Sequence, residues 1–304
     1  MDKFILIDGT ALVFRGFYAI PRLALPDGTP INAVFGFYHI LINLLLHEKP
    51  THFAVCFDRH ETTNRKKEFE DYKATRTKAP DDLYAQIGPI KDILTEGKLH
   101  LVEKPGIEAD DLIATIAKAN EQNPNLDIQV YSSDLDLIQL VNEHTSILKP
   151  GNAKTGNELI TPNKVLEKYG FGPHQIPDYK GLHGDPSDNL PGVKGVGEKT
   201  AAKLIQDFGS LENIYNNLDQ LTPNLRGKLE TDKEQAELCK RLATLHTDIE
   251  IPTNPEDYEI AKIDFETITQ KFQDLKFNKL LIKLWNLQKH IKAAEQSKLQ
   301  GSLF

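Results

Sequence analysis

The chain has 304 residues, of which 39% are hydrophobic and 26% are charged, and its formal net charge is −8. This composition is typical of a folded soluble protein and excludes general disorder, while the length suffices for one large domain or two smaller ones. The apolar runs are too short to cross a bilayer, and we expect neither a membrane span nor a secretory signal. The two cysteines, Cys56 and Cys239, are far apart, which indicates a reducing compartment and gives no metal-binding cluster.

The first half of the chain alternates short apolar runs with amphipathic stretches. Buried strands are expected at 3–8, 52–57, 99–102, 127–132 and 145–148. Helical spacing is present at 31–47, 82–96 and 108–121. This alternation predicts an α/β fold, with a mostly parallel central sheet that helices cover on both faces.

Helical patterns dominate after about residue 160, and the chain ends in a polar tail. We therefore expect an α/β catalytic domain at 1–183 and a helical C-terminal region at 184–304. A polar segment at about 59–82 interrupts the α/β pattern and is too long for an ordinary connection. Its residues 59–79 hold seven Lys or Arg and four Asp or Glu, a local charge of +3.

Acidic residues follow the predicted strands and recur in the motif GDPSDN. The nine candidates are Asp8, Asp58, Glu108, Asp110, Asp111, Asp134, Asp136, Asp185 and Asp188. Any one of them could simply cap a helix or face solvent. Because ligands of parallel sheets bind beyond the carboxyl ends of the strands, we expect these acids to converge. Converging carboxylates repel one another unless cations lie among them, and oxygen ligands without a His or Cys cluster favour Mg²⁺ or Mn²⁺.

One competing interpretation starts from Asp8-Gly9-Thr10 after a hydrophobic strand, a pattern similar to that of the haloacid-dehalogenase phosphatases. The nucleophilic aspartate of that family would fall at position 6, which is Leu6 here. The sequence therefore lacks the nucleophile that a phosphatase of this family would need.

The longer motifs resemble the 5′-nuclease (5′-3′ exonuclease) domain of bacterial DNA polymerase I, within the flap endonuclease family. The matching stretches include ILIDGTALVFRGFYA, PTHFAVCFD, YKATR, PGIEADDLIA, SDLDLIQL, ITPNKVLEKYG and GDPSDNLPGVKGVGEKTAAKLI, in the order of the family. The resemblance implies a PIN-like 5′-nuclease fold with a helical arch at about 59–82. It also implies a helix-hairpin-helix DNA-binding motif at about 185–210.

The same resemblance implies a metal-dependent, structure-specific 5′-3′ exonuclease and flap endonuclease. Such an enzyme hydrolyses phosphodiester bonds of DNA and RNA primers at 5′ ends, nicks and flaps during replication and repair. By analogy two or so ions are expected: Asp8, Asp58, Glu108, Asp110 and Asp111 with Asp134 would face one, and Asp136, Asp185 and Asp188 the other. Lys73 and Arg76 would contact the scissile phosphate.

The resemblance also assigns residues to DNA binding. These are Arg15, Tyr72, Lys73, Arg76, Gly192, Lys194, Gly195, Gly197, Lys199 and Thr200. Tyr72 would stack on a base, and the glycine hairpin GVKGVGEKT would bind duplex backbone and a monovalent cation such as K⁺. The acidic net charge does not oppose DNA binding: without the nine acids, 35 Asp and Glu remain against 36 Lys and Arg.

The chain ends in QGSLF, which resembles the short peptide that binds the bacterial sliding clamp. Leu303 and Phe304 would fill an apolar pocket while Gln300 bonds its rim. We expect a monomer in the bacterial cytoplasm, associated with the nucleoid, and a polymerase domain if the chain is a fragment. Two alternatives stay open: a non-catalytic DNA-binding module, which would need damaged metal ligands, and an RNA-directed PIN-like nuclease, which would lack the hairpin and the arch.

Overall fold

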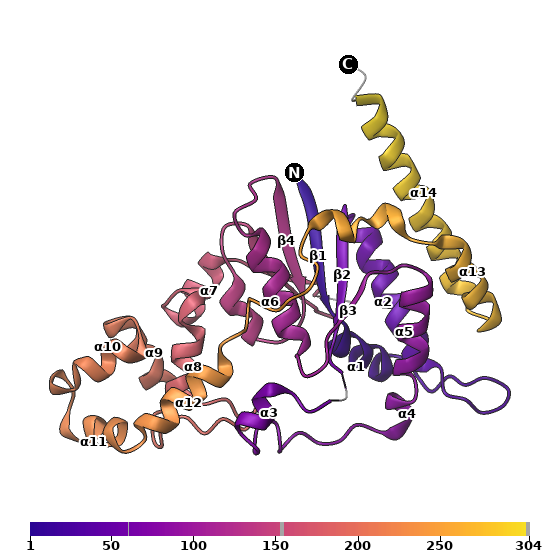
Figure 1. The fold of residues 1–304 in the computed structure, drawn as a ribbon. Coiled ribbons are helices and arrows are strands. Elements are labelled where there is room, and N and C mark those ends of the chain that lie inside the picture. The colour runs from indigo at the N-terminus through magenta and orange to yellow at the C-terminus, as the bar shows by residue number, and fades with distance from the viewer. Residues whose placement is uncertain (60, 153–154, 302–304) are drawn as a thin grey trace.

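The computed structural model describes residues 1–59, 61–152 and 155–301, and a sheet runs through its centre (Figure 1). The strands are β1 (Asp2–Asp8), β2 (His52–Phe57), β3 (Leu101–Glu103), β4 (Leu126–Tyr131), β5 (Thr145–Lys149) and β6 (Glu158–Ile160), in the order β3-β2-β1-β4-β5-β6. The first five strands run parallel, and β6 pairs antiparallel with β5. The predicted mostly parallel sheet is confirmed, and the five predicted strands lie where apolar runs indicated them.

Alternate residues of the central strand enter two different cores. Phe4 and Leu6 pack on the side of α6 (Ala109–Asn120), whereas Ile5 and Ile7 pack on the side of α1 and α2. The helices of this second side are α1 (Gly9–Ala19), α2 (Asn32–Glu48), α4 (Asp81–Tyr84) and α5 (Ile87–Glu96). Successive side chains of a strand point to opposite faces, so an apolar run without alternation fits a sheet that is covered on both faces.

The sequence interpretation did not single out α1. This helix begins at Gly9, directly after β1, and the Asp8 carboxylate caps it by accepting the Ala11 N–H at 2.9 Å. No polar turn separates β1 from α1. In the local sequence, only the capping residue Asp8 therefore marks the start of the helix.

The second half of the chain is helical, as expected, but it does not pack as one region. The elements that follow β6 are α7 (Pro162–Tyr169), α8 (Ile176–His183), α9 (Glu198–Phe208), α10 (Leu211–Asn216), α11 (Pro223–Thr231) and α12 (Lys233–Ala243), with short 3-10 turns between some of them. These helices share the core of α6 or pack on α8. The last two helices, α13 (Phe265–Asp274) and α14 (Asn278–Gly301), return to the α/β body and bury Phe272 and Leu284 against α2 and α5 (Figure 1).

The expected helical arch differs from what the structure contains. Within the described part of 59–82, the helical residues are α3 (Asn64–Glu68) and the first residues of α4, and turns connect them. Lys73 has a φ of +57°, a left-handed conformation that interrupts any continuous helix. We call residues 64–78 the basic segment; it lies below the sheet at its carboxyl end (Figure 1).

No helix among the described residues is both long and apolar enough to cross a membrane.

Candidate active site

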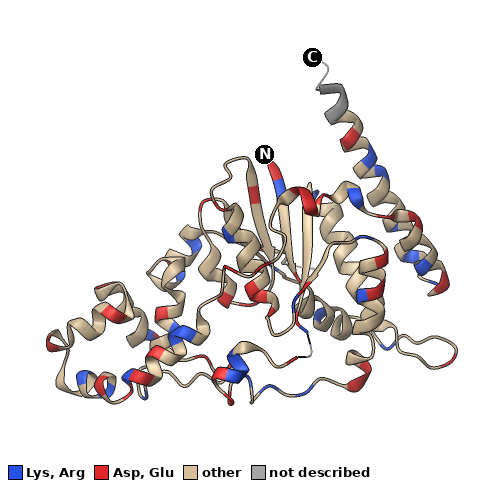
Figure 2. Cartoon of the chain, viewed as in Figure 1, with Lys and Arg blue, Asp and Glu red and all other residues tan. Residues whose placement is uncertain are grey.

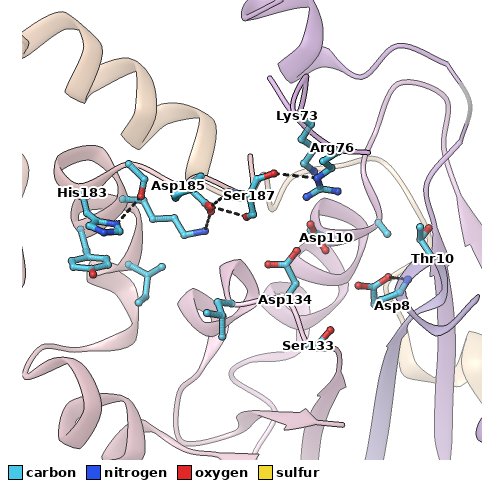
Figure 3. Close-up of a pocket in the computed structure, with 18 of the residues that line it drawn as sticks. Asp8, Thr10, Lys73, Arg76, Asp110, Ser133, Asp134, His183, Asp185 and Ser187 are labelled. Atoms are coloured by element: carbon cyan, nitrogen blue, oxygen red, sulfur yellow. Dashed lines mark hydrogen bonds and ion pairs between the residues drawn. The ribbon is translucent and has the colours of Figure 1, made fainter. Parts of the chain in front are cut away.

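A cleft of about 630 Å³ opens at the carboxyl ends of β1 and β4. The chain passes from β1 to β2 on one side and reaches β4 on the other, so the strand order reverses at this point. Such a switch point is where open α/β sheets bind ligands. The acids that line the cleft are Asp8, Asp58, Asp110, Asp134, Asp185 and Glu198. Figure 3 shows the side chains of Asp8, Asp110, Asp134 and Asp185 turned toward the same space.

Four carboxylates form what we call the first acid group: Asp8, Asp58, Asp110 and Asp134. Local hydrogen bonds hold them in place. The Ser132 hydroxyl donates to Asp8 at 2.9 Å, and Asp58 accepts the Ala109 N–H at 2.8 Å. The latter bond joins the end of β2 to the first turn of α6, which is the turn that carries Asp110.

Burial and mutual repulsion raise the pKa values of Asp8, Asp110 and Asp134. The pKa of Asp8 rises to about 7 because its carboxylate is buried and because Asp58 and Asp134 lie near it. Burial together with Asp134 and Asp8 raises the pKa of Asp110 well above its usual value. Burial also raises the pKa of Asp134, although Lys180 opposes the shift. The carboxylates therefore lie close enough to disfavour simultaneous ionisation without a counter-charge.

A second acid group consists of Asp136, Asp185 and Asp188, which offer oxygen atoms within 4.8 Å of one another. Lys180, near the end of α8, forms ion pairs with both Asp136 and Asp185, the latter at 2.5 Å. Burial alone would raise the pKa of Asp185, but Lys180 and the Ser187 hydrogen bonds lower it. The predicted grouping of these three acids is consistent with this geometry.

Glu108 and Asp111 do not line the cleft with the first acid group. Both carboxylate oxygens of Asp111 accept hydrogen bonds of 2.7 Å from the guanidinium of Arg65, and the residue is only 2% exposed. Glu108 pairs with Lys73 at 2.7 Å and lies 3.6 Å from Arg65. In this structure these two acids balance cations of the basic segment, and their assignment to the first ion stays a prediction.

The basic segment lies at the rim of the cleft and contacts Asp188 of the second acid group. The Arg76 guanidinium donates to Asp188 at 2.7 Å, and the Lys73 backbone N–H donates to the Asp188 carbonyl at 2.9 Å. Arg76 is half-exposed at the rim of the cleft, beside Lys73 and Ser187 (Figure 3). Figure 2 shows the blue-coloured ribbon of α3 below the sheet, on the side of its carboxyl ends.

Tyr72 does not lie where base stacking would need it. Its ring is 3% exposed and packs with Leu242 and Ala243 of α12, and its hydroxyl donates to Asp188 at 2.9 Å. The sequence could not distinguish a stacking tyrosine from a buried one, because both occur beside basic residues.

The glycine hairpin lies between α8 and α9, which gives the predicted helix-hairpin-helix order. Val193 and Val196 are buried and anchor it, while Lys194, Gly195, Gly197 and Lys199 are exposed and Thr200 is half-buried. Gly192 and Gly195 have φ values of +63° and +77°, which favour glycine. Gly197 is the N-cap of α9 and provides no side chain to bond the free N–H groups of that helix.

The remaining predicted residues lie elsewhere. Arg15 donates from its guanidinium to the Gly151 carbonyl, in the loop after β5. Leu303 and Phe304 lie outside the described residues; Gln300 belongs to the last turn of α14, and its side chain is likewise not described.

Sequence reasoning missed two residues of the site. Lys180 bridges two acids of the second group, and the Ser132 hydroxyl orients Asp8. Lys180 carries no motif of its own, since a lysine near a helix end also suits the helix dipole. Ser132 follows β4 among other small residues, and only the parallel pairing of β1 with β4 shows its proximity to Asp8.

The donor set fits hard divalent cations. Both acid groups offer carboxylate oxygens, and the described histidine of the cleft, His183, bonds through Nδ1 to the Gly184 carbonyl. Carboxylates without accompanying thiolates or free imidazoles favour Mg²⁺ or Mn²⁺ over Zn²⁺. The raised pKa of Asp8 reflects its burial beside other carboxylates, and a bound cation would favour its ionised form.

Comparison with known protein families gives two adjoining matches. Residues 3–170 match the family described as 5′-3′ exonuclease, N-terminal resolvase-like domain. Residues 171–266 match the family described as 5′-3′ exonuclease, C-terminal SAM fold.

Relatives of similar and of greater length were found. The chain is 40% identical to the 5′-3′ exonuclease of Aquifex aeolicus over 282 residues, which cover 92% of this chain and 94% of that protein. It is 42% identical to DNA polymerase I of Bacillus subtilis over 283 residues, which cover 93% of this chain and 32% of that protein. It is 39% identical to DNA polymerase I of Caldicellulosiruptor bescii, with 93% and 33% covered. The chain thus spans about a third of these polymerases.

Solved structures share the fold at low sequence identity. A flap endonuclease of bacteriophage T5, in a complex with DNA and metal ions, aligns with a TM-score of 0.64 and 18% identity, covering 95% of this chain and 99% of that one. The catalytic core of Rad2, in a complex with DNA substrate, aligns with a TM-score of 0.62 and 19% identity over 93% and 92% of the two chains. The predicted 5′-nuclease fold is confirmed, and the chain belongs to the 5′-3′ exonuclease family.

Proposed function

We propose that this chain is a metal-dependent, structure-specific 5′-3′ exonuclease and flap endonuclease. It would hydrolyse phosphodiester bonds of DNA and of RNA primers at 5′ ends, nicks and flaps during replication and repair. The observation that carries the proposal is that the first acid group and Asp185 of the second line one cleft, with Lys73 and Arg76 of the basic segment at its rim. The family membership supports the same chemistry.

The proposed cofactor is Mg²⁺, with Mn²⁺ as a substitute. The first acid group would hold one ion, and Asp136, Asp185 and Asp188 would hold a second. When bound, the ions would supply an activated water and stabilise the attacking and leaving oxygens of the phosphodiester. The products would carry a 5′-phosphate.

The cations of the chain would bind and orient the DNA. Lys73 and Arg76 lie at the rim of the cleft and carry donors suited to the scissile phosphate, Arg76 through a planar fork. Each is paired with a carboxylate, so DNA phosphate would compete with Glu108 and Asp188 for them. We include Asp58, Asp110 and Asp134 among the catalytic residues because they line the cleft.

The glycine hairpin would bind the duplex beside the cleft. Lys194, Lys199 and the free N–H groups at the start of α9 favour backbone phosphate. We also propose K⁺ at this hairpin, although the Gly195 carbonyl already accepts the Lys228 ammonium at 3.0 Å. To contact DNA, Arg15 would need to break its hydrogen bond with the Gly151 carbonyl. Tyr72 would need to leave its buried position.

Three partner proposals concern the whole protein. We propose a monomer that works in the bacterial cytoplasm, associated with the nucleoid. The DNA polymerase I relatives support a polymerase domain if the chain is part of a longer protein. Residues Gln300, Leu303 and Phe304 would bind a sliding clamp, and deletion of 300–304 without any loss of clamp affinity would contradict this.

Cleavage of end-labelled flap, nicked and blunt duplexes tests the main proposal. We expect cleavage of flap and nicked substrates with Mg²⁺ and none with excess chelator. Asp134→Asn, which changes the first acid group, is the matched inactive variant. Cleavage that persists in chelator, or in this variant, would contradict the metal-dependent mechanism.

A further inference from the structure

A buried ion pair near the cleft joins residues that are 46 positions apart. Arg65 of α3 and Asp111 of α6 are 5% and 2% exposed, and two hydrogen bonds of 2.7 Å connect them. Two charges withdrawn from water in this way need complete hydrogen bonding to be tolerated.

The hydrogen bonding of this pair is extensive. Arg65 also donates from Nε to the Leu242 carbonyl and from Nη2 to the Thr244 carbonyl, each at 2.9 Å. Asp111 accepts the His246 N–H at 2.9 Å in addition to the guanidinium. The pair therefore ties three parts of the chain together: α3, the first turn of α6 and the stretch 242–246 after α12.

Backbone hydrogen bonds connect Arg65 to the rest of the basic segment. The Arg65 carbonyl accepts the Phe69 N–H at 2.9 Å, and the Phe69 carbonyl accepts the Tyr72 N–H at 3.0 Å. The Lys73 carbonyl then accepts the Arg76 N–H at 3.2 Å. Phe69 and Tyr72 also pack on α12. A displacement of Arg65 would consequently move the two cations at the rim of the cleft.

We propose that the Arg65–Asp111 pair is a positioning device, which fixes the basic segment over the cleft, and that Asp111 does not ligate metal. Resting on the proposed function, this inference assigns Asp111 and Arg65 to the placement of Lys73 and Arg76 for DNA phosphate. It separates Asp111 from its neighbour Asp110, which lines the cleft. An ion could recruit Asp111 only by breaking both bonds to a buried guanidinium, which would leave that charge unpaired.

Three aspartate-to-asparagine variants distinguish the roles. Asp111→Asn tests the pair, and Asp110→Asn tests a carboxylate of the cleft. Asp178→Asn is the structural control, because Asp178 is also buried, pairs with Lys240 at 2.7 Å and accepts the Leu211 N–H at 2.8 Å, away from the basic segment.

The readouts are Mn²⁺ affinity by titration calorimetry, the rate of trypsin cleavage within residues 65–78, and KM and kcat on a flap substrate. All are measured well below the unfolding midpoint of each variant. For Asp111→Asn we expect unchanged Mn²⁺ affinity, and trypsin cleavage faster by about tenfold or more, since the loss of a buried ion pair exceeds the free energy of one factor of ten. We also expect a KM that rises more than kcat falls.

For Asp110→Asn we expect Mn²⁺ affinity to fall by about tenfold or more, with trypsin cleavage unchanged. Asp178→Asn should lower the unfolding midpoint and alter neither readout. The proposal is overturned if Asp111→Asn weakens Mn²⁺ binding as Asp110→Asn does, or if it leaves the trypsin rate unchanged. These two readouts need no cleavage of DNA, so they decide the inference even if the proposed nuclease activity fails.

Arg65→Lys provides the second variant in case Asp111→Asn does not fold. It keeps a positive charge beside Asp111 but loses the paired bonds and the contacts with the carbonyls of Leu242 and Thr244. We expect faster trypsin cleavage and unchanged Mn²⁺ affinity again. A basic segment as resistant to trypsin as that of the unchanged protein would overturn the proposal.

Discussion

The adjacent residues Asp110 and Asp111 point their carboxylates in different directions: Asp110 lines the cleft, and Asp111 binds the guanidinium of Arg65. Consecutive residues of an α-helix are rotated by about 100° around its axis, so neighbours in sequence cannot share a target. Glu108 and Asp111, three positions apart, lie on one side and both contact Arg65. The first turn of α6 thus supplies acids to the cleft and to the basic segment at the same time.

Arg76→Ala should weaken DNA binding without unfolding the protein. Its side chain is half-exposed, and its loss removes a cation from the rim while Tyr72 and Lys73 still contact Asp188. We expect the dependence of log affinity on log salt to become shallower by about one unit, as for one lost phosphate contact. Titration of labelled flap DNA at several salt concentrations measures this slope, and Arg226→Ala, a change on α11, is the control. An unchanged slope for Arg76→Ala would contradict its assignment to phosphate.

Lys180→Met should destabilise the metal-free protein. Lys180 is 11% exposed and is the counter-charge of Asp136 and Asp185, so its removal leaves two nearby carboxylates without compensation. We expect a loss on the order of 3 kcal/mol in the free energy of unfolding with chelator present. Divalent ions should restore more stability to this variant than to the unchanged protein. Urea unfolding with chelator and with Mg²⁺ measures both effects, and equal stabilisation of the two proteins by Mg²⁺ would refute this assignment.

Binding of a divalent ion should release protons near neutral pH. Because burial, with Asp58 and Asp134, raises the pKa of Asp8 to about 7, this carboxyl is largely protonated at pH 6 and largely ionised at pH 8. An ion must displace the proton at the lower pH, so Mn²⁺ affinity should increase from pH 6 to pH 8. Calorimetry at pH 7 in two buffers of different ionisation enthalpy counts the protons released. Asp8→Asn should show fewer, and identical heats in both buffers would count against the raised pKa.

Gly192→Ala should destabilise the glycine hairpin, whereas Gly197→Ala should not. At Gly192 the φ is +63° and a Cβ atom would lie 2.3 Å from the backbone nitrogen of Gly184. At Gly197 a Cβ atom would meet nothing within 4 Å. We expect Gly192→Ala to cost at least about 2 kcal/mol of unfolding free energy. Gly197→Ala should cost less than about 1 kcal/mol. Thermal unfolding of both variants provides the comparison, and equal midpoints would contradict the hairpin geometry.

The local sequence determined the sheet and the general location of the site. Apolar runs without alternation require burial on both faces, so the strands could be located from the local sequence pattern, and acids at their carboxyl ends marked the cleft. The nine acids lie in one neighbourhood. They line the cleft, group with Asp185 beside it, or pair with Arg65 and Lys73 of the basic segment. These conclusions depend on short-range pattern, which is independent of how distant segments pack.

Tertiary structure alone decided which acid has which neighbour. Asp111 and Arg65 are separated by 46 residues, and Lys180 reaches Asp136 across 44, so no spacing rule in the sequence joins them. The buried position of Tyr72 and the return of α13 and α14 to the first half of the chain have the same origin. Charge pairing and burial depend on contacts between segments that fold together, and only the assembled core selects among the partners that each side chain could reach.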